Sequence, residues 1–397
     1  MREAAPPLTG KPFLTVNIAW HPAFVAGQDL AEKVIAFYGR TYIANVGGGV
    51  GIPVRLVKSI DEGSVPTPID LSISEAVATI ILLDDNWLTD EAWIAWGVAL
   101  EQMTRTSGFK SRLFPVAFTS GLDRAHLKSQ AVLYNEWTDL DDDDRIRKLT
   151  SDLSHQFCKL LRHWLAEQNA SEGSEDAVER ERFRQPVKLF LSHSKHDKYG
   201  ITIADAIRDY LHKNKELRSF FDVHDIASGS EFDIEILDNI RVCAFVAVHT
   251  DSYSSREWCR REVLEAKRHH VPAIVINSID EAEERAFPYL GNVPVLRVNP
   301  NAISRLDVVI GAVLTEVLRD YLWRCWVKQV EAYVQPTDFF VPRAPELLIF
   351  ASSLGETPIN IIYPEPPISA EEEILFQNIR PGTKLFSMRQ WIADRGL

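Results

Sequence analysis

The stretch RVCAFVAVHTDSYSSREWCRREV, Arg241–Val263, consists of an apolar strand-like run, a polar turn and an amphipathic helix-like run. The same succession occurs 165 residues earlier, in AVATIILLDDNWLTDEAWIAWGV, Ala76–Val98. The two stretches superpose without a gap, so that Trp93 meets Trp258 and Gly97 meets Glu262. Short buried strands that alternate with helices are typical of a parallel sheet with helices on both faces. The shared register favours an internal duplication in which only the second copy has the carboxylate.

Strand-like and helix-like segments alternate on both sides of these two stretches. In the first half we expect strands at Phe13–Ile18, Ile52–Val57, Ala78–Leu83 and Leu113–Phe118, and helices at Asp29–Tyr38, Glu91–Met103 and Arg145–Glu167. In the second half we expect strands at Lys188–Ser192, Ser219–Asp222, Val242–Val248 and Ala273–Asn277, and helices at Ile203–Lys213, Glu257–Arg268 and Leu306–Gln329. The fold class is therefore predicted to be α/β, with two flavodoxin-like domains that each contain a five-stranded parallel sheet.

Composition shifts divide the chain into four parts. Residues 169–186, NASEGSEDAVERERFRQP, are polar, highly charged and poor in core-forming side chains, which indicates a linker. Residues 1–168 form the first predicted domain, and residues 187–333 form the second. Residues 334–397 differ from both and are expected to form a small α/β segment, whose role the sequence does not reveal.

The overall composition excludes several classes of protein. A chain of 397 residues with a formal net charge of −13 has no general affinity for nucleic acids or anionic membranes. The four cysteines are widely spaced without a CxxC pair, which indicates a reducing compartment and neither a zinc site nor a disulfide framework. Neither a leader peptide nor a long apolar run is evident, so we expect a cytoplasmic protein without a membrane segment.

Two conspicuous motifs are better explained by local structure than by chemistry. The acidic run Asp139–Asp144 precedes a predicted helix, where carboxylates suit the positive end of the helix dipole, so we do not read it as a metal site. The glycine-rich run Gly47–Gly51 lacks the GK[ST] of a phosphate-binding loop and precedes a strand. We interpret it as a flexible turn.

Three segments of the second half resemble a known family when taken in order. They are VKLFLSHSKHDK (Val187–Lys198), SFFDVHDIASGSEF (Ser219–Phe232) and DSYSSREWCRRE (Asp251–Glu262). They are similar to the first strand, the second strand with its BB loop, and the helix with the active-site glutamate of TIR (Toll/interleukin-1 receptor) domains of the prokaryotic NAD-cleaving type. The first half then corresponds to a degenerate TIR-like copy with a regulatory or assembly role.

The resemblance implies roles for particular residues. Glu262 would be the catalytic carboxylate, and NAD⁺ would be the substrate, with no cofactor and no metal. The residues implied to bind substrate are Ser192, His193, Lys195, Phe221, Asp222, Phe232 and Trp258. In the family the BB loop also mediates self-association, so we expect an oligomer formed through TIR domains.

The chemistry of the bond supports a role for one carboxylate. Cleavage of the bond between nicotinamide and ribose passes through an oxocarbenium-like state, which a nearby carboxylate stabilises. Nicotinamide leaves as a neutral molecule, so no general acid is required. Trp258 lies four residues before Glu262 and would share its helix face. The alternative is a surface carboxylate paired with Arg261, Lys267 or Arg268.

The preferred hypothesis is therefore an NAD⁺ glycohydrolase that acts as an antiphage-defence effector, is activated by assembly, and responds to an upstream partner or signal molecule. The alternatives are a synthase of a cyclic ADP-ribose signal and a non-catalytic TIR adaptor. A phospho-acceptor of the response-regulator type is a weaker alternative, because the second domain offers only Asp222 at a predicted strand end.

Overall fold

The computed structural model describes residues 11–39, 50–57, 65–108, 110–168, 184–224, 240–283, 287, 289–351 and 359–396. These residues fall into two compact units, one formed by Thr9–Arg184 and the other including Gln185–Leu397. The predicted glycine-rich turn, the predicted linker and the BB loop lie largely or wholly outside the described residues.

The first unit contains a five-stranded parallel sheet in the order β2-β1-β3-β4-β5. Its central strand β3 has eight buried residues in succession, because helices cover both of its faces. The elements of this unit are β1 (Leu14–Trp20), α1 (Ala26–Tyr38), β2 (Val54–Val57), β3 (Ala76–Leu83), α2 (Asp85–Thr89), α3 (Glu91–Thr106), β4 (Ser111–Ala117), η1 (Leu122–Ala125), β5 (Val132–Leu133), η2 (Tyr134–Glu136) and α4 (Asp142–Gln168).

The second unit contains a five-stranded parallel sheet in the order β10-β9-β8-β6-β7. When it is read from β7, the order is β7-β6-β8-β9-β10, which corresponds strand by strand to the order in the first unit. It is the strand order of flavodoxin-like folds. Its elements are β6 (Val187–His193), α6 (Lys198–Lys213), α7 (Lys215–Phe220), β7 (Phe221–His224), β8 (Cys243–His249), α9 (Glu257–Arg268), β9 (Ala273–Asn277), β10 (Val295–Arg297), α10 (Leu306–Val330) and η3 (Glu331–Tyr333).

These two sheets confirm the predicted fold class. One predicted strand is wrong in position: β7 begins at Phe221, whereas the sequence placed the end of this strand at Asp222. The residues before it, Lys215–Phe220, form the short helix α7, which Asn214 caps by accepting the backbone N–H groups of Glu216 and Leu217. The cap therefore moves the strand two residues toward the C-terminus.

A third sheet of three parallel strands, in the order β11-β12-β13, forms in the C-terminal part of the second unit. We call residues 338–396 the C-terminal module. Serine capping boxes begin both of its helices. Its elements are β11 (Asp338–Phe340), η4 (Leu347–Ala351), β12 (Asn360–Tyr363), α11 (Ala370–Ile379), β13 (Lys384–Ser387) and α12 (Met388–Asp394).

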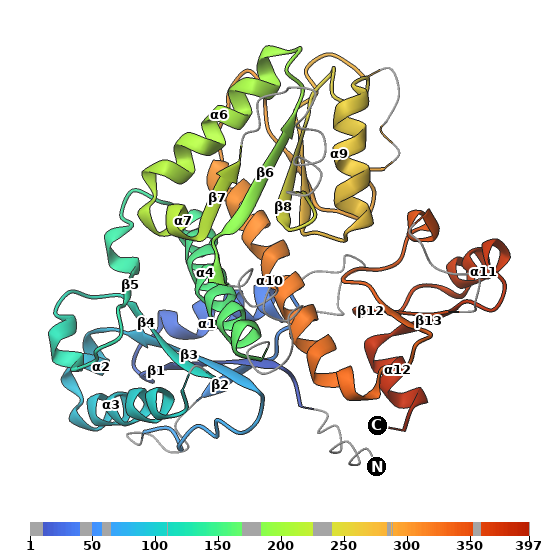
Figure 1. Cartoon of the computed structure of the whole chain (residues 1–397). Helices are drawn as coiled ribbons and strands as arrows, with labels where there is room; N and C mark the ends of the chain where they lie inside the picture. Colours follow the sequence, from blue (N-terminus) through green and yellow to red (C-terminus); the bar gives the residue numbers. More distant parts are fainter. Residues whose placement is uncertain are drawn as a thin grey trace. The chain divides into compact units, whose positions relative to one another are not determined.

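The long helix α10 connects this module to the five-stranded sheet (Figure 1). It contacts β9 and β8, and Trp323 and Val330 toward its C-terminal end belong to a core cluster with Met388 and Trp391 of the module. One helix thus contributes to two cores. Within the described residues, no helix is both long enough and apolar enough to span a membrane.

One buried ion pair closes the C-terminal module. The Asp338 side chain is fully buried, and Arg395 contacts both of its oxygens at 2.9 and 2.7 Å. The same carboxylate accepts hydrogen bonds from Asn360 and from the backbone N–H of Gln335. Removal of its charge leaves a partly buried guanidinium without its counterion.

We therefore predict that Asp338→Asn destabilises the C-terminal module by about 3 kcal/mol. Amide hydrogen exchange of β11–β13 measures this effect locally, with Glu331→Gln, which removes half of an exposed ion pair with Lys328, as the control. Equal exchange rates in the two variants would contradict the role of the Asp338–Arg395 pair.

Candidate active site

Glu262 lies on α9, which packs against the second sheet beside β8 (Figure 1). Cys259, Val263 and Ala266 fix the orientation of this helix, because they belong to one core cluster with residues of β8 and β9. Their spacing of about one turn places them on one face. The Glu262 side chain leaves this face next to the carboxyl end of β6, and the residue is only 6% exposed.

Two hydroxyl groups connect Glu262 to the sheet. Ser192 Oγ, at the end of β6, donates a hydrogen bond to Glu262 Oε2 at 2.5 Å, and it lies 2.6 Å from the hydroxyl of Tyr253. Serine has a single hydroxyl proton, and that proton goes to the carboxylate. The phenol of Tyr253 therefore donates to Ser192, and the chain of donors runs from Tyr253 through Ser192 to Glu262.

Burial and these hydrogen bonds act on the pKa of Glu262 in opposite directions. Burial raises this pKa, because the ionised form loses its hydration, and its effect is the largest, so that the pKa is about 7. Hydrogen bonds from Ser192 and Trp258 lower the pKa, as does the positive charge of Lys195. The result is a carboxylate that changes its charge near neutral pH, which is characteristic of functional sites.

A second polar network ties together the loops that follow β6 and β8. Asp197 accepts hydrogen bonds from the hydroxyls of Ser252 and Thr250 and from the backbone N–H of Gly200, and so caps α6. Ser194 Oγ lies 2.7 Å from Ser252 Oγ and donates to it, because the single hydroxyl proton of Ser252 goes to Asp197. Burial raises the pKa of Asp197, but these hydrogen bonds outweigh it and hold the pKa below its usual value.

Sequence reasoning missed Tyr253 and Asp197. Asp197 precedes a helix by one residue and could have been recognised as an N-cap. Tyr253 gave no such signal, since its side chain is completely buried and its partner is 61 residues away in sequence. A tyrosine in a polar turn is ordinarily expected to be exposed.

The structure brings together Glu262, Ser192 and Trp258 from the predicted set. The Trp258 ring packs on the core cluster beneath α9, and the guanidinium of Arg261 lies 4.7 Å from the centre of the ring. Lys195 is exposed in the loop after β6, close enough to influence Glu262. His193 ends β6 and is partly buried near Asp197.

Phe221 and Asp222 do not join this group. The predicted strand placed them at the carboxyl edge, but they begin β7, and Phe221 pairs in register with Val187 at the start of β6. Ser192 is five residues further along β6, roughly 16 Å away at the rise of a strand. Phe221 is buried against Phe220, and Asp222 is exposed at the opposite edge. Phe232 lies outside the described residues.

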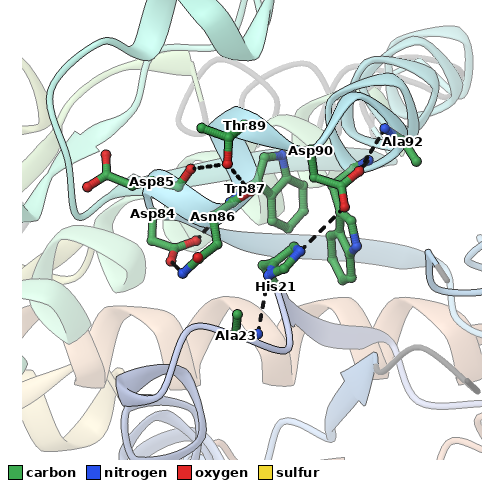
Figure 2. A network of polar contacts seen from close by, with 10 residues as sticks. His21, Ala23, Asp84, Asp85, Asn86, Trp87, Thr89, Asp90 and Ala92 are labelled. Atoms are coloured by element: carbon green, nitrogen blue, oxygen red, sulfur yellow. Dashed lines mark hydrogen bonds and ion pairs between the residues drawn. The ribbon is translucent and has the colours of Figure 1, made fainter. Parts of the chain in front are cut away.

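The corresponding edge of the first sheet has a different network, which Figure 2 shows. Asp84 accepts the backbone N–H of Trp87, and Asp90 accepts those of Ala92 and Trp93, so these aspartates cap α2 and α3. His21 Nε2 lies 3.6 Å from Asp90. The two carboxylates accept backbone N–H groups at the starts of these helices, and this structural role explains their presence at the edge of the sheet.

In the first domain, the position that corresponds to Glu262 lies against a buried indole. The sequence register assigns Gly97 to this position, and a Cβ atom there would lie 3.4 Å from the indole of Trp87. Trp87 is 1% exposed and packs edge-on against Trp93. An indole therefore fills the space next to α3.

Comparison with known protein families agrees with this geometry. Residues 189–299 match the model of the TIR domain family. No curated protein matches the chain. The matched segment contains Ser192, Tyr253, Trp258 and Glu262, and it excludes the first domain and the C-terminal module.

The pKa of Glu262 predicts a pH dependence of stability. Because the folded protein holds this proton up to about pH 7, against a usual pKa of 4.5, the stabilisation is complete at low pH and is lost as the pH rises through 7. Relative to Glu262→Gln, the wild type should lose roughly 3 kcal/mol of unfolding free energy between pH 4.5 and 8.

Urea unfolding at several pH values measures this difference. Glu257→Gln is the matched control, since it removes an exposed carboxylate from the first turn of the same helix, and it should follow the wild type. Parallel curves for the wild type and Glu262→Gln would show that the pKa of Glu262 is not raised.

Proposed function

We propose, from the TIR domain that residues 189–299 of this chain form, that the protein cleaves NAD⁺ to nicotinamide and ADP-ribose, with Glu262 as the catalytic carboxylate. The observation that carries this proposal is the buried carboxylate at the carboxyl edge of the sheet, held by Ser192 at 2.5 Å. Ligands of open α/β sheets bind at this edge. An exposed helix carboxylate without function would need no such arrangement.

The reaction requires Glu262 in its ionised form. When the bond between the ribose C1′ and the nicotinamide nitrogen breaks, the electron pair goes to the nitrogen and nicotinamide leaves neutral. The ribose keeps the positive charge, which the carboxylate stabilises at close range in a site of low polarity. Water then adds to C1′ and loses a proton to give ADP-ribose. Because the donor chain from Tyr253 ends on Glu262, it favours the ionised state.

The burial of Glu262 supports activation by assembly. At 6% exposure the carboxylate is not open to a substrate as large as a dinucleotide, so α9 or its surroundings must move before turnover. Association through TIR domains supplies such a rearrangement and explains how the protein stays inactive until an upstream partner or signal promotes assembly. This regulation suits an antiphage-defence effector that acts on cytoplasmic NAD⁺.

The first domain is assigned a regulatory or assembly role. It shares the strand order of the second, but in the sequence register it has Gly97, packed beside Trp87, where the second domain has Glu262. All turnover is therefore assigned to the second domain.

Two other functions remain candidates. A synthase of a cyclic ADP-ribose breaks the same bond, but a group of the substrate replaces water as the second nucleophile. A non-catalytic adaptor would use the TIR domain only for association; the Ser192–Glu262 contact favours an enzyme, because an adaptor has no need of a buried carboxylate.

We predict that the purified protein releases nicotinamide from NAD⁺ and that Glu262→Gln lowers the rate at least 100-fold, since it removes the stabilising charge. Chromatography of the products distinguishes ADP-ribose from a cyclic product. Glu257→Gln is the control and should retain the wild-type rate. Equal release by Glu262→Gln would remove Glu262 from the mechanism, and no release by the assembled wild type would favour the adaptor.

We also predict that the rate rises with pH through about 7, as Glu262 ionises. Ser192→Ala removes a hydrogen bond to the ionised form, so the midpoint of the pH–rate profile should move up by about one unit. Tyr253→Phe keeps the ring but loses its donor, and should move the midpoint in the same direction by a smaller amount. A midpoint that moves down in Ser192→Ala would contradict the direction of this donor chain.

A further inference from the structure

The C-terminal module contacts the helix that carries Glu262. Lys267, five residues after Glu262 on α9, forms an ion pair with Glu346 of the module at 2.6 Å. The Lys267 side chain is 4% exposed, so water screens this pair weakly. Lys267 also donates to the carbonyl of Gly291 at 2.5 Å.

Two further hydrogen bonds join the same regions. Arg343 donates to the carbonyl of Val271, just beyond the end of α9, and Asn292 donates to the carbonyl of Ala344, both at 2.5 Å. We call residues 341–349 the strap. Val341 and Ile349, at its two ends, are buried in a core cluster of the C-terminal module. The strap is therefore anchored in one sheet while it holds the end of a helix from another.

The two ends of α9 are fixed by different means. At its N-terminus, Arg256 makes no side-chain capping hydrogen bond, unlike Asp90 of α3 and Asp197 of α6. In the last two turns of α9, Glu265 pairs with Arg241 and Lys267 pairs with Glu346. Side-chain contacts at the C-terminal end thus contribute strongly to the position of the helix.

Glu262 is rigidly connected to this end. It lies five residues from Lys267, a distance of about 7.5 Å along the helix axis. Its hydrogen bond with Ser192 at 2.5 Å leaves little freedom, so a small shift of α9 would break it. Reaction rates depend steeply on displacements of this size.

We propose that Glu346 is a positioning residue for the carboxylate of Glu262, acting through Lys267 and α9, a role that rests on the proposed NAD cleavage. The strap thereby makes the C-terminal module part of the active TIR domain. The module lies outside the matched family segment.

The test uses the full chain and the variants Glu346→Ala, Lys267→Met and their combination. Glu331→Ala is the matched control, because it removes a glutamate that pairs with Lys328 at the end of α10. The first measurement is amide hydrogen exchange of α9, which requires no enzymatic activity. The second is kcat and KM for NAD⁺.

We expect exchange in α9 to become about tenfold faster in Glu346→Ala, and kcat to fall about tenfold with little change in KM. The double variant should be no worse than the more severe single variant, because both changes break one contact. Glu331→Ala should match the wild type in both measurements.

Unchanged exchange in α9, or losses of kcat that multiply in the double variant, would overturn the role of Glu346. Faster exchange in α9 with a wild type that releases no nicotinamide would refute NAD cleavage and the catalytic part of the inference together. The mechanical link through the strap would then stand supported on its own.

Discussion

The second domain depends on keeping one carboxylate buried at the edge of a parallel sheet. A buried carboxylate is costly unless donors reach it, and here Ser192 and Tyr253 supply them in sequence. The cost is not fully offset, since burial still raises the pKa of Glu262 to about 7. The remaining cost of ionising this buried carboxylate is typical of a functional site, where stability is commonly lost for the sake of activity. The core beneath α9 and the network around Asp197 hold the helix and the loops that make the arrangement possible.

The two five-stranded sheets show how one architecture accommodates opposite solutions at the same position. In the second domain Ser192 lies near the end of the first strand, β6, and Glu262 faces it from α9. In the first domain, aspartates cap the neighbouring helices, and Trp87 packs where Gly97 leaves space. A glycine against an indole is stable without any polar partner, because dense apolar packing replaces the donors that Glu262 requires. The first sheet thus retains the architecture while its edge is filled.

Much of this organisation could be predicted from the sequence, for physical reasons. Runs such as Ala76–Leu83 can be buried on both faces only within a parallel sheet, so the fold class followed from pattern alone. Strand β7 was misplaced because its start is set by the helix cap at Asn214, which a propensity reading overlooks. Tyr253 was missed because its function depends on a partner from a distant strand. The strap was likewise invisible, since the Lys267–Glu346 pair joins segments that no periodicity relates. Local signals predict elements well, whereas contacts between elements require the folded chain.

The helix α10 places a geometric condition on the evolution of this chain. It begins against one sheet and ends inside the core of another, and its 25 residues span about 37 Å without a break. Each residue added to or deleted from its middle would rotate the C-terminal module by about 100° around the helix axis. Such a change would carry the strap away from α9, even though every local contact in both cores survived. The helical phase of α10 therefore fixes the direction in which the strap faces α9, so the length of this helix matters as much as the residues at its two ends.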